Sequence, residues 1–308
     1  MHCTGHYSVP CGHSSAPTWW AATTTMAALL ALLSALAYGV GDFFGGLSAR
    51  RLPSSAVVLR THVAGLAGLV VLLPLVEASP GGHDIVVGAV GGVAGGLGVL
   101  LFYRAMAEGT MSLVAPITSV LTAVIPVVYG LSTGDRPSLL GLVGIPIALV
   151  AVTLLARDPG ESTRSGLSPL QALQALAAGL GFGMFFIALD MAGDGAGLWP
   201  VIAGRTTSVT LFALVALVSP AARVGGRGAR TGPVVAMLVA CGLLDAWANA
   251  LLLFATHHGM ITLVAVLGSL YPAATLLLAR TVLGERLARP QLGGVALAGA
   301  AVVLVSVG

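Results

Sequence analysis

The 308-residue chain is 57% hydrophobic and only 8% charged, with a formal net charge of +3 at pH 7. Soluble globular domains average about 25% charged residues, so this composition excludes a water-soluble globular protein and indicates that lipid is the main solvent. All 14 basic residues are arginines, and most of them stand between apolar runs. That distribution is typical of membrane-flanking loops and does not fit the clustered basic face of a nucleic-acid-binding protein.

Residues 1–26 stand apart, because they hold neither a charged side chain nor a sustained apolar run. Several are zinc-ligand types: His2, Cys3, His6, Cys11 and His13. Their spacing fits no common zinc site, so we predict no metal here. No positive region precedes an apolar core, which argues against a signal peptide. We interpret this segment as a disordered extension or a misassigned start.

From residue 27 onward, the sequence divides into apolar segments joined by short links, the longest of them rich in Gly, Pro or Arg. A membrane-spanning helix needs about 20 predominantly apolar residues. Ten segments meet this requirement: 27–47, 55–76, 85–105, 110–131, 138–156, 170–190, 198–219, 233–255, 260–280 and 290–307. No link is long enough for a soluble domain, so the predicted fold class is an all-α integral membrane protein with ten transmembrane helices.

Two long stretches of the chain are similar to each other. Gly109–Gly144 aligns with Gly259–Gly294, and each is an apolar run followed by a short turn and the start of another apolar run. The turn reads Gly134-Asp135-Arg136 in the first copy and Gly284-Glu285-Arg286 in the second. A match of this length indicates an internal duplication.

Shorter matches extend the repeat toward the start of each half. Tyr38-Gly39 resembles Phe182-Gly183, and Arg60-Thr61 resembles Arg205-Thr206. The residues that the two copies share are interpreted as scaffold, and those they do not share are the better functional candidates.

The duplication predicts two five-helix repeats, at 27–156 and 170–307, joined by a linker at 157–169. Because five is odd, the second copy must enter the bilayer from the opposite face. Inverted repeats of this kind are the plan of many secondary transporters, which bind their solute near the bilayer midplane between the halves.

Each half ends in an apolar helix, a Gly-acid-Arg turn and a final helix rich in small residues. In the second half, this pattern includes Ser269-Leu270-Tyr271-Pro272, Leu283-Gly284-Glu285-Arg286-Leu287 and Gln291-Leu292-Gly293. With these motifs, residues 27–307 resemble the EamA-like branch of the drug/metabolite transporter superfamily. The resemblance implies a ten-helix transporter fold, and it leaves the substrate open because members handle amino acids, sugars, drugs and other metabolites.

Two further motifs resemble a bacterial subgroup of the same family. They are Tyr38-Gly39-Val40-Gly41-Asp42-Phe43 and Leu198-Trp199-Pro200.

Arginines are distributed unevenly between the predicted loops. The odd-numbered loops hold Arg50, Arg51, Arg157, Arg164, Arg223, Arg227, Arg230, Arg286 and Arg289. The even-numbered loops hold only Arg136. The positive-inside rule therefore predicts odd-numbered loops in the cytoplasm and both termini outside. Members of the resembling family usually have both termini inside, so the two indications disagree, and we adopt the arginine count as the prediction.

Charged side chains inside a membrane span are costly and mark functional sites by default. Asp42 lies late in the first span, where it fits either a site for a substrate amine or proton, or a carboxylate at a helix end that pairs with an arginine. Arg60 and Arg205 occupy equivalent places in the two halves, which favours a structural tie over their alternative role in substrate binding. His62 is interpreted as a packing residue.

Asp245 is the sharpest single candidate for a solute contact. It lies midway through the eighth span, and its repeat partner is Gly95, so the duplicated scaffold does not require the carboxylate. Asn249 follows four residues later and shares its helix face, whereas Trp247 points elsewhere but remains a candidate. The alternative role of Asp245 is a buried pair with an arginine of the second or seventh span.

Proline and glycine positions predict how the helices meet. Prolines are expected to break the helices that line the repeat interface, at Pro116, Pro126, Pro146 and Pro272. Tyr271-Pro272 would place a free backbone acceptor beside an aromatic ring. Glycines of the third span follow small-xxx-small spacing, which predicts close helix contacts, at Gly88, Gly91, Gly92, Gly95 and Gly96.

We therefore predict a secondary active transporter of the inner (plasma) membrane that exports small organic metabolites or drugs by alternating access. The candidate substrate-binding residues are Asp42, Arg60, Arg205, Asp245, Trp247, Asn249 and Tyr271. The expected partners are a small-molecule substrate, the bilayer and a coupling ion such as the proton, without a cofactor, a metal or nucleic acid.

Two alternatives stay open: a lipid-carrier flippase, and a membrane enzyme or partner protein that does not transport. The sequence contains no Walker A, His-Glu-x-x-His or Gly-x-Ser-x-Gly motif, which disfavours the common enzyme classes.

Overall fold

The computed structural model describes residues 18–108, 111–155, 168–218, 232–283 and 289–307, and all regular secondary structure in these ranges is helical. The helices are α1 (Thr18–Ala49), α2 (Ser54–Leu72), η1 (Leu73–Leu75), α3 (Gly82–Glu108), α4 (Met111–Thr133), α5 (Leu139–Leu155), α6 (Pro169–Asp190), η2 (Asp194–Ala196), α7 (Trp199–Val218), α9 (Gly232–His258), α10 (Ile261–Gly268), α11 (Tyr271–Leu283) and α12 (Arg289–Val307). The zinc-type residues before α1, most of the predicted linker and the turn Gly284-Glu285-Arg286 lie outside the described residues.

Helix length supports eight membrane spans within the described ranges. These are α1, α2, α3, α4, α6, α7, α9 and α12. The predicted fifth span, α5, has 17 residues, and the predicted ninth span is split into α10 and α11. The multi-pass, all-helical fold is therefore confirmed, whereas length alone does not confirm the count of ten. In addition, α1 begins at Thr18 and so extends back into segment 1–26.

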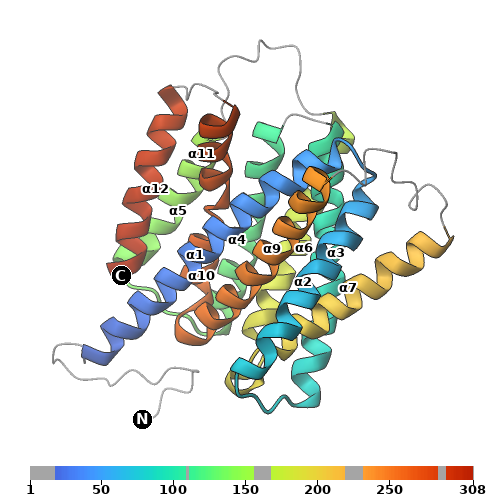
Figure 1. Ribbon diagram of the computed structural model, residues 1–308. Helices are drawn as coiled ribbons and strands as arrows, with labels where there is room; N and C mark the ends of the chain where they lie inside the picture. The colour runs from blue at the N-terminus through green and yellow to red at the C-terminus, as the bar shows by residue number, and fades with distance from the viewer. Residues whose placement is uncertain (1–17, 109–110, 156–167, 219–231, 284–288, 308) are drawn as a thin grey trace.

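The two halves run in opposite directions. Figure 1 shows that α1 starts at the end of the molecule where α12 finishes, whereas α6 starts at the opposite end. The packing partners repeat as well, because α1 lies on α9 just as α6 lies on α3, and α2 lies on α9 just as α7 lies on α3. α2 and α7 pack on each other, as do α5 and α12. Every helix of one half thus meets the other half through equivalent contacts.

Glycines set the distance between the halves, as their spacing predicted. A Cβ atom on Gly92 of α3 would lie less than 3.0 Å from backbone atoms of Gly204 in α7, and Gly88 is equally close to Pro200. The repeat partner of Gly92 is Gly242 of α9, which meets the backbone of Thr61 in α2 in the same way. Side chains larger than hydrogen would push these helices apart.

Prolines act differently from the prediction. Pro116 and Pro126 lie within α4 and Pro146 within α5, and both helices continue through them. Only Pro272 is next to a break, between α10 and α11. It stands in the first turn of α11, where its missing N–H costs no helix hydrogen bond. Pro272 therefore begins a new helix, and the expectation of broken helices at the other three prolines was wrong.

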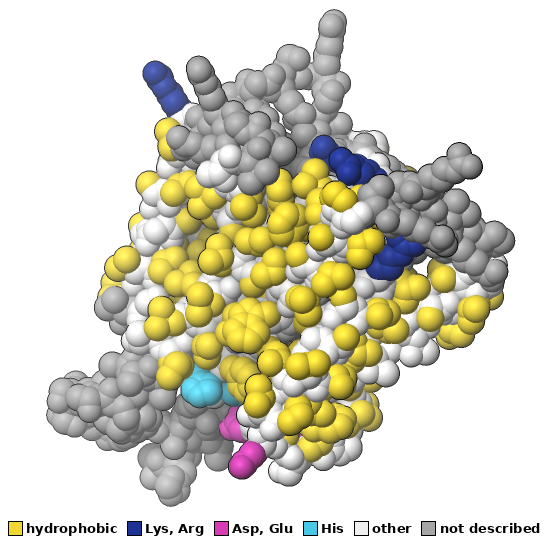
Figure 2. All heavy atoms as spheres, viewed as in Figure 1, with side chains coloured by type: hydrophobic (Ala, Val, Ile, Leu, Met, Phe, Trp, Pro, Cys, Tyr) yellow, Lys and Arg dark blue, Asp and Glu magenta, His cyan; other side chains and the backbone are white. Residues whose placement is uncertain are grey.

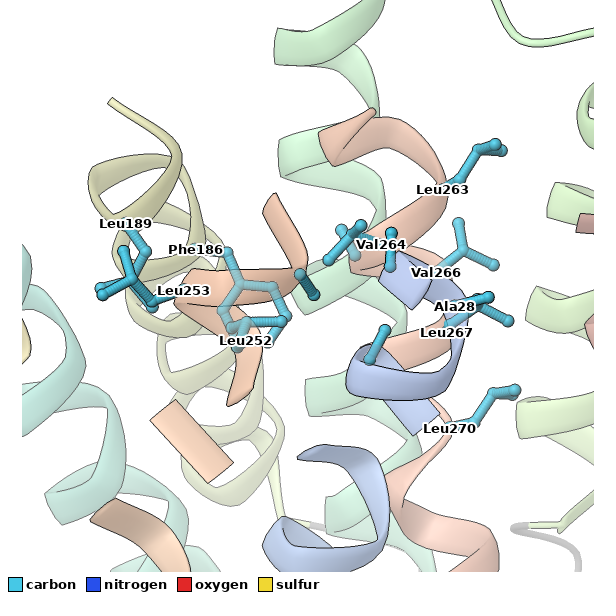
Figure 3. Packing of buried hydrophobic residues seen from close by; sticks show 14 of the residues in the cluster. Ala28, Phe186, Leu189, Leu252, Leu253, Leu263, Val264, Val266, Leu267 and Leu270 are labelled. Atoms are coloured by element: carbon cyan, nitrogen blue, oxygen red, sulfur yellow. The ribbon is translucent and has the colours of Figure 1, made fainter. Parts of the chain in front are cut away.

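The apolar core lies where α1, α6, α9 and α10 meet. Figure 3 shows Phe186 and Leu189 of α6 beside Leu252 and Leu253 of α9, with the α10 side chains next to Ala28 of α1. Every residue of α10 is buried, which no membrane-facing helix of this length would be. α10 is therefore an internal half-helix enclosed by the longer spans.

The outer surface has an apolar middle and two different ends. Figure 2 shows apolar side chains over the middle of one face, arginines at one end and acidic and histidine side chains at the other. Arg50 and Arg51 follow α1, Arg104 lies near the end of α3 and Arg289 begins α12, so these arginines share the end away from the finish of α12. The exposed apolar belt fits a bilayer, and the two ends fit its two surfaces.

Two carboxylates tie the halves together at the end where α12 finishes. Asp135, after α4, accepts hydrogen bonds from the backbone N–H (2.9 Å) and hydroxyl (2.6 Å) of Thr262 in the first turn of α10. Gly134 reaches a φ of +127° just before it, a conformation that favours glycine. Asp84 of α3 accepts from the backbone N–H of Gly193, between α6 and α7, at 2.9 Å. The first half thus caps backbone groups of the second half.

Candidate functional site

A cavity of about 60 Å³ lies between the two halves. Helices of both halves line it, with Tyr38, Asp42, His62, Gly92, Gly95, Gly96, Val99, Thr122, Phe182, Phe185, Phe186, Val201, Gly204, Arg205, Ser208, Asp245, Asn249 and Tyr271.

The cavity walls follow the internal repeat. Tyr38 and Asp42 on α1, with Asp245 and Asn249 on α9, form what we call the polar wall. Their repeat partners are Phe182 and Phe186 on α6, with Gly95 and Val99 on α3, and these form the apolar wall. The two walls therefore occupy equivalent positions of the repeat, but one carries polar side chains and the other carries apolar residues. A solute that fills the cavity meets charge on one wall and aromatic surface on the other.

Asp42 has no ion-pair or hydrogen-bond partner among the described residues. It lies about two helical turns before the end of α1, on the side facing the cavity. The alternative that Asp42 pairs with an arginine near the membrane surface is therefore not what the described part of the chain shows. An unpaired carboxylate in a low-dielectric cavity attracts a cation or a proton.

Asp245 forms an ion pair with Arg205, whose Nη2 donates to its Oδ2. Both side chains are mostly removed from solvent, with 7% of Arg205 and 17% of Asp245 exposed. Asn249 donates to the backbone carbonyl of Asp245 at 2.8 Å, and its Oδ1 accepts from the hydroxyl of Tyr38. Asp245 is therefore the buried partner of Arg205 and also lines the cavity, while its contact with a solute stays a prediction.

Aromatic rings form the remaining surface of the cavity. The ring of Tyr38 stacks on that of Phe186, with centroids 6.3 Å apart. Phe186 also belongs to the apolar core seen in Figure 3, so the core fixes the position of this ring. The Tyr271 hydroxyl donates to the carbonyl of Ala115 at 3.5 Å. Rings held by packing and hydrogen bonds offer a preformed surface to a flat or apolar group.

The structure brings together five of the seven sequence candidates. The cavity is lined by Asp42, Arg205, Asp245, Asn249 and Tyr271. Trp247 is 51% exposed and Arg60 of α2 is half-buried, and neither lines the cavity. Arg60 is the repeat partner of Arg205. Arg205 pairs with Asp245 of α9, but the residue equivalent to Asp245 in the first half is Gly95, so the repeat gives Arg60 no corresponding acid.

Sequence reasoning missed Tyr38 and the phenylalanines of the apolar wall. Tyr38 and Phe182 recur in the two halves, which favours a scaffold role, yet both line the cavity. Their occurrence at equivalent positions of the two halves could have identified them, because equivalent positions of an inverted repeat lie at the same interface. His62 is 3% exposed and its Nδ1 lies 2.6 Å from the Ser208 hydroxyl across the cavity wall.

Within the described residues, no group of three or more His, Cys, Asp or Glu side chains is arranged to hold a metal ion. For binding, the cavity offers one unpaired carboxylate, one ion pair, hydrogen bonds and aromatic surface.

Comparison with known proteins identifies the family. The sequence profile of the EamA-like transporter family matches residues 25–157 and 170–307. No curated protein is similar to this chain. One solved structure, described only as "Crystal structure of protein", is 18% identical with a TM-score of 0.71, over 90% of this chain and 95% of that one. At this identity the likeness shows a common fold and carries nothing about function.

Proposed function

Because this chain belongs to the EamA-like transporter family, we propose that it is a secondary active exporter of small cationic organic solutes. It works by alternating access in the inner (plasma) membrane, with the cavity between its halves as the solute site.

The unpaired carboxylate of Asp42 carries this proposal. Arg205 and Asp245 neutralise each other, whereas the Asp42 carboxyl has no ion-pair partner among the described residues. A buried charge without a partner is unfavourable, and a solute cation or a proton relieves it. A carboxylate that binds a proton and a solute cation alternately couples solute transport to a proton gradient, and this coupling needs no nucleotide hydrolysis.

The two walls narrow the class of solute. A cation with an attached aromatic or apolar group would place its charge at Asp42 on the polar wall and its ring against Phe182 and Phe186 on the apolar wall. Cations are also attracted to the faces of aromatic rings, such as that of Tyr38. We therefore expect aryl cations to be preferred over anions of the same size.

Alternating access follows from the equivalence of the halves. The contacts of α1 with α9 and of α6 with α3 are interchangeable by the repeat, so two conformations of similar energy are available. Asp84 and Asp135 hold the halves together at one end of the molecule. Release of these carboxylates and closure at the opposite end would give the second conformation.

Transport by reconstituted protein tests the proposal. Proteoliposomes would be loaded with phenyltrimethylammonium or with benzenesulfonate, which are ring compounds with permanent and opposite charges. With an imposed proton gradient, we expect flux of the cation and no flux of the anion. We expect Asp42→Asn to lower the cation flux at least tenfold, because the amide can neither ionise nor take up a proton, and Asp42→Glu to retain part of it.

Trp247→Leu is the matched control, because this side chain lies outside the cavity, and its flux should equal that of the wild type. Equal flux of both ions, or full flux by Asp42→Asn at equal reconstitution, would contradict the proposal.

A further inference from the structure

His62 and Ser208 form a buried pair between α2 and α7 at the edge of the cavity. Their Nδ1 and Oγ atoms are 2.6 Å apart, and the residues are 3% and 1% exposed. Neither residue takes part in the ion pair or in the polar wall described above. Gly96 of α3 makes room for this pair, because a Cβ atom there would lie 2.5 Å from the Ser208 hydroxyl.

The hydrogen bonds around Ser208 are compatible with a His62 tautomer that carries its hydrogen on Nε2. The neighbouring Thr206 and Thr207 hydroxyls donate to backbone carbonyls one turn earlier, at 2.8 Å and 2.9 Å. Ser208 makes no such bond among the described residues, so its hydroxyl hydrogen is available to Nδ1 of His62, and it is donated there in the tautomer that carries its hydrogen on Nε2.

The Nε2 atom of His62 is buried and has no hydrogen-bond partner in the described part of the chain. Leaving a buried N–H unpaired costs free energy, and an oxygen acceptor placed in the adjoining cavity would recover it. His62 lines the same cavity as Asp42, and because its Nε2 is covered in this structure, a solute oxygen would reach that atom only after the neighbouring side chains move aside.

We propose that His62 is a specificity-determining residue whose Nε2–H donates a hydrogen bond to a carbonyl-type oxygen of the solute. The inference rests on the proposed function and deepens it: the preferred solute is a cation that also carries an oxygen acceptor on its apolar body. Ser208 is a positioning residue, because it acts by fixing the tautomer and the ring of His62.

A pair of isosteric ligands isolates this hydrogen bond. 3- and 4-Acetylbenzylamine carry an ammonium group and a carbonyl oxygen, and the corresponding isopropenylbenzylamines replace that oxygen with CH₂. Dissociation constants for the purified protein in detergent would be measured by calorimetry. For the better-binding positional isomer, we expect the wild type to prefer the acetyl compound about fivefold, the size of one net hydrogen bond.

The variants then assign the preference to one atom. We expect His62→Leu to bring the ratio of the two dissociation constants close to one and Ser208→Ala to reduce it. His62→Gln should keep most of the preference, because its amide N–H reaches a similar place. Trp247→Leu, outside the cavity, should keep all of it. If His62→Leu does not fold, Ser208→Ala serves as the test, and an undiminished preference in that variant would overturn the inference.

Three other outcomes would overturn the inference. One is an equal affinity of the wild type for both compounds, and another is a preference that persists in His62→Leu. In either case, the proposed function would still be supported if the wild type binds the cations and Asp42→Asn weakens that binding. The third outcome is no binding of any of these amines or of phenyltrimethylammonium, and this would overturn the proposed function as well.

Discussion

Two carboxylates in one cavity have different tasks because their neighbours differ. Asp245 faces Arg205 and forms an ion pair, whereas Asp42 has no such partner among the described residues. An ion pair away from water stabilises little compared with an apolar pair of the same size, but the loss of one partner is strongly destabilising. The pair therefore holds α7 and α9 in place, while Asp42 remains available to a solute.

This division of tasks predicts a strong coupling between Arg205 and Asp245. Arg205→Leu alone leaves Asp245 as an unpaired buried charge and should lower the free energy of unfolding by about 3–5 kcal/mol. The double variant Arg205→Leu with Asp245→Leu should lose much less than the sum of the two single variants. Thermal unfolding in detergent, arranged as a double-mutant cycle, measures this coupling. Additive losses would mean that the two side chains do not stabilise each other in the folded protein.

The sequence was sufficient to select the charged residues of the candidate site but not Tyr38 or the apolar wall. A charge inside an apolar run is conspicuous, so Asp42, Asp245 and Arg205 were identified by residue type alone. Phe182 and Tyr38 are unremarkable in a membrane helix, and only their position on the interface makes them part of the cavity. Residue type also overvalued Trp247, because a large aromatic ring is equally stable against lipid.

At the scale of helices, glycine spacing predicted contacts better than proline predicted breaks. Glycine acts through close approach, and the spacing of Gly88 and Gly92 placed both on the face that meets α7. A proline removes one hydrogen bond, and whether the helix breaks depends on the surrounding helices, which the sequence does not show. Pro126 is accordingly inside a continuous α4, whereas Pro272 begins a helix.

The crossing of α3 and α7 gives a testable prediction. In Gly92→Ala, the new methyl group would collide with backbone of Gly204, which cannot yield as a flexible side chain would. We expect a loss of about 1–3 kcal/mol in the free energy of unfolding, as for other overpacked interiors. The thermal midpoint in detergent is the measurement.

Gly299→Ala in α12 is the matched control, because no atom lies within 4 Å of the added methyl group. Alanine favours a helix by up to about 1 kcal/mol over glycine, so this variant should be as stable as the wild type or more so. A similar loss in both variants would indicate that the α3–α7 contact is not the cause.

At the scale of the whole molecule, the duplication determined most of the fold. When each copy of a repeat has an odd number of spans, the second copy must cross the membrane in the opposite direction to the first. The equivalent contacts of α1 with α9 and of α6 with α3 agree with this inverted arrangement. The sequence did not reveal that α10 is a short internal helix, because an apolar run looks the same against lipid and against protein. Burial, which distinguishes the two, is a property of the assembled fold.

The same assembly leads to a prediction for the orientation of the protein in the membrane. The arginines that follow α1 and precede α12 share one end, and both the start of α1 and the finish of α12 lie at the other. Each arginine near an anionic cytoplasmic leaflet contributes about 1 kcal/mol, so the arginine-rich end should face the cytoplasm. We expect alkaline phosphatase fused after Gly308 to be active and green fluorescent protein at the same position to be dark. Fusions after Arg164, in the link between the halves, should give the opposite result. If the Gly308 fusions fluoresce and lack phosphatase activity, the termini are cytoplasmic, and the family tendency outweighs the arginine distribution.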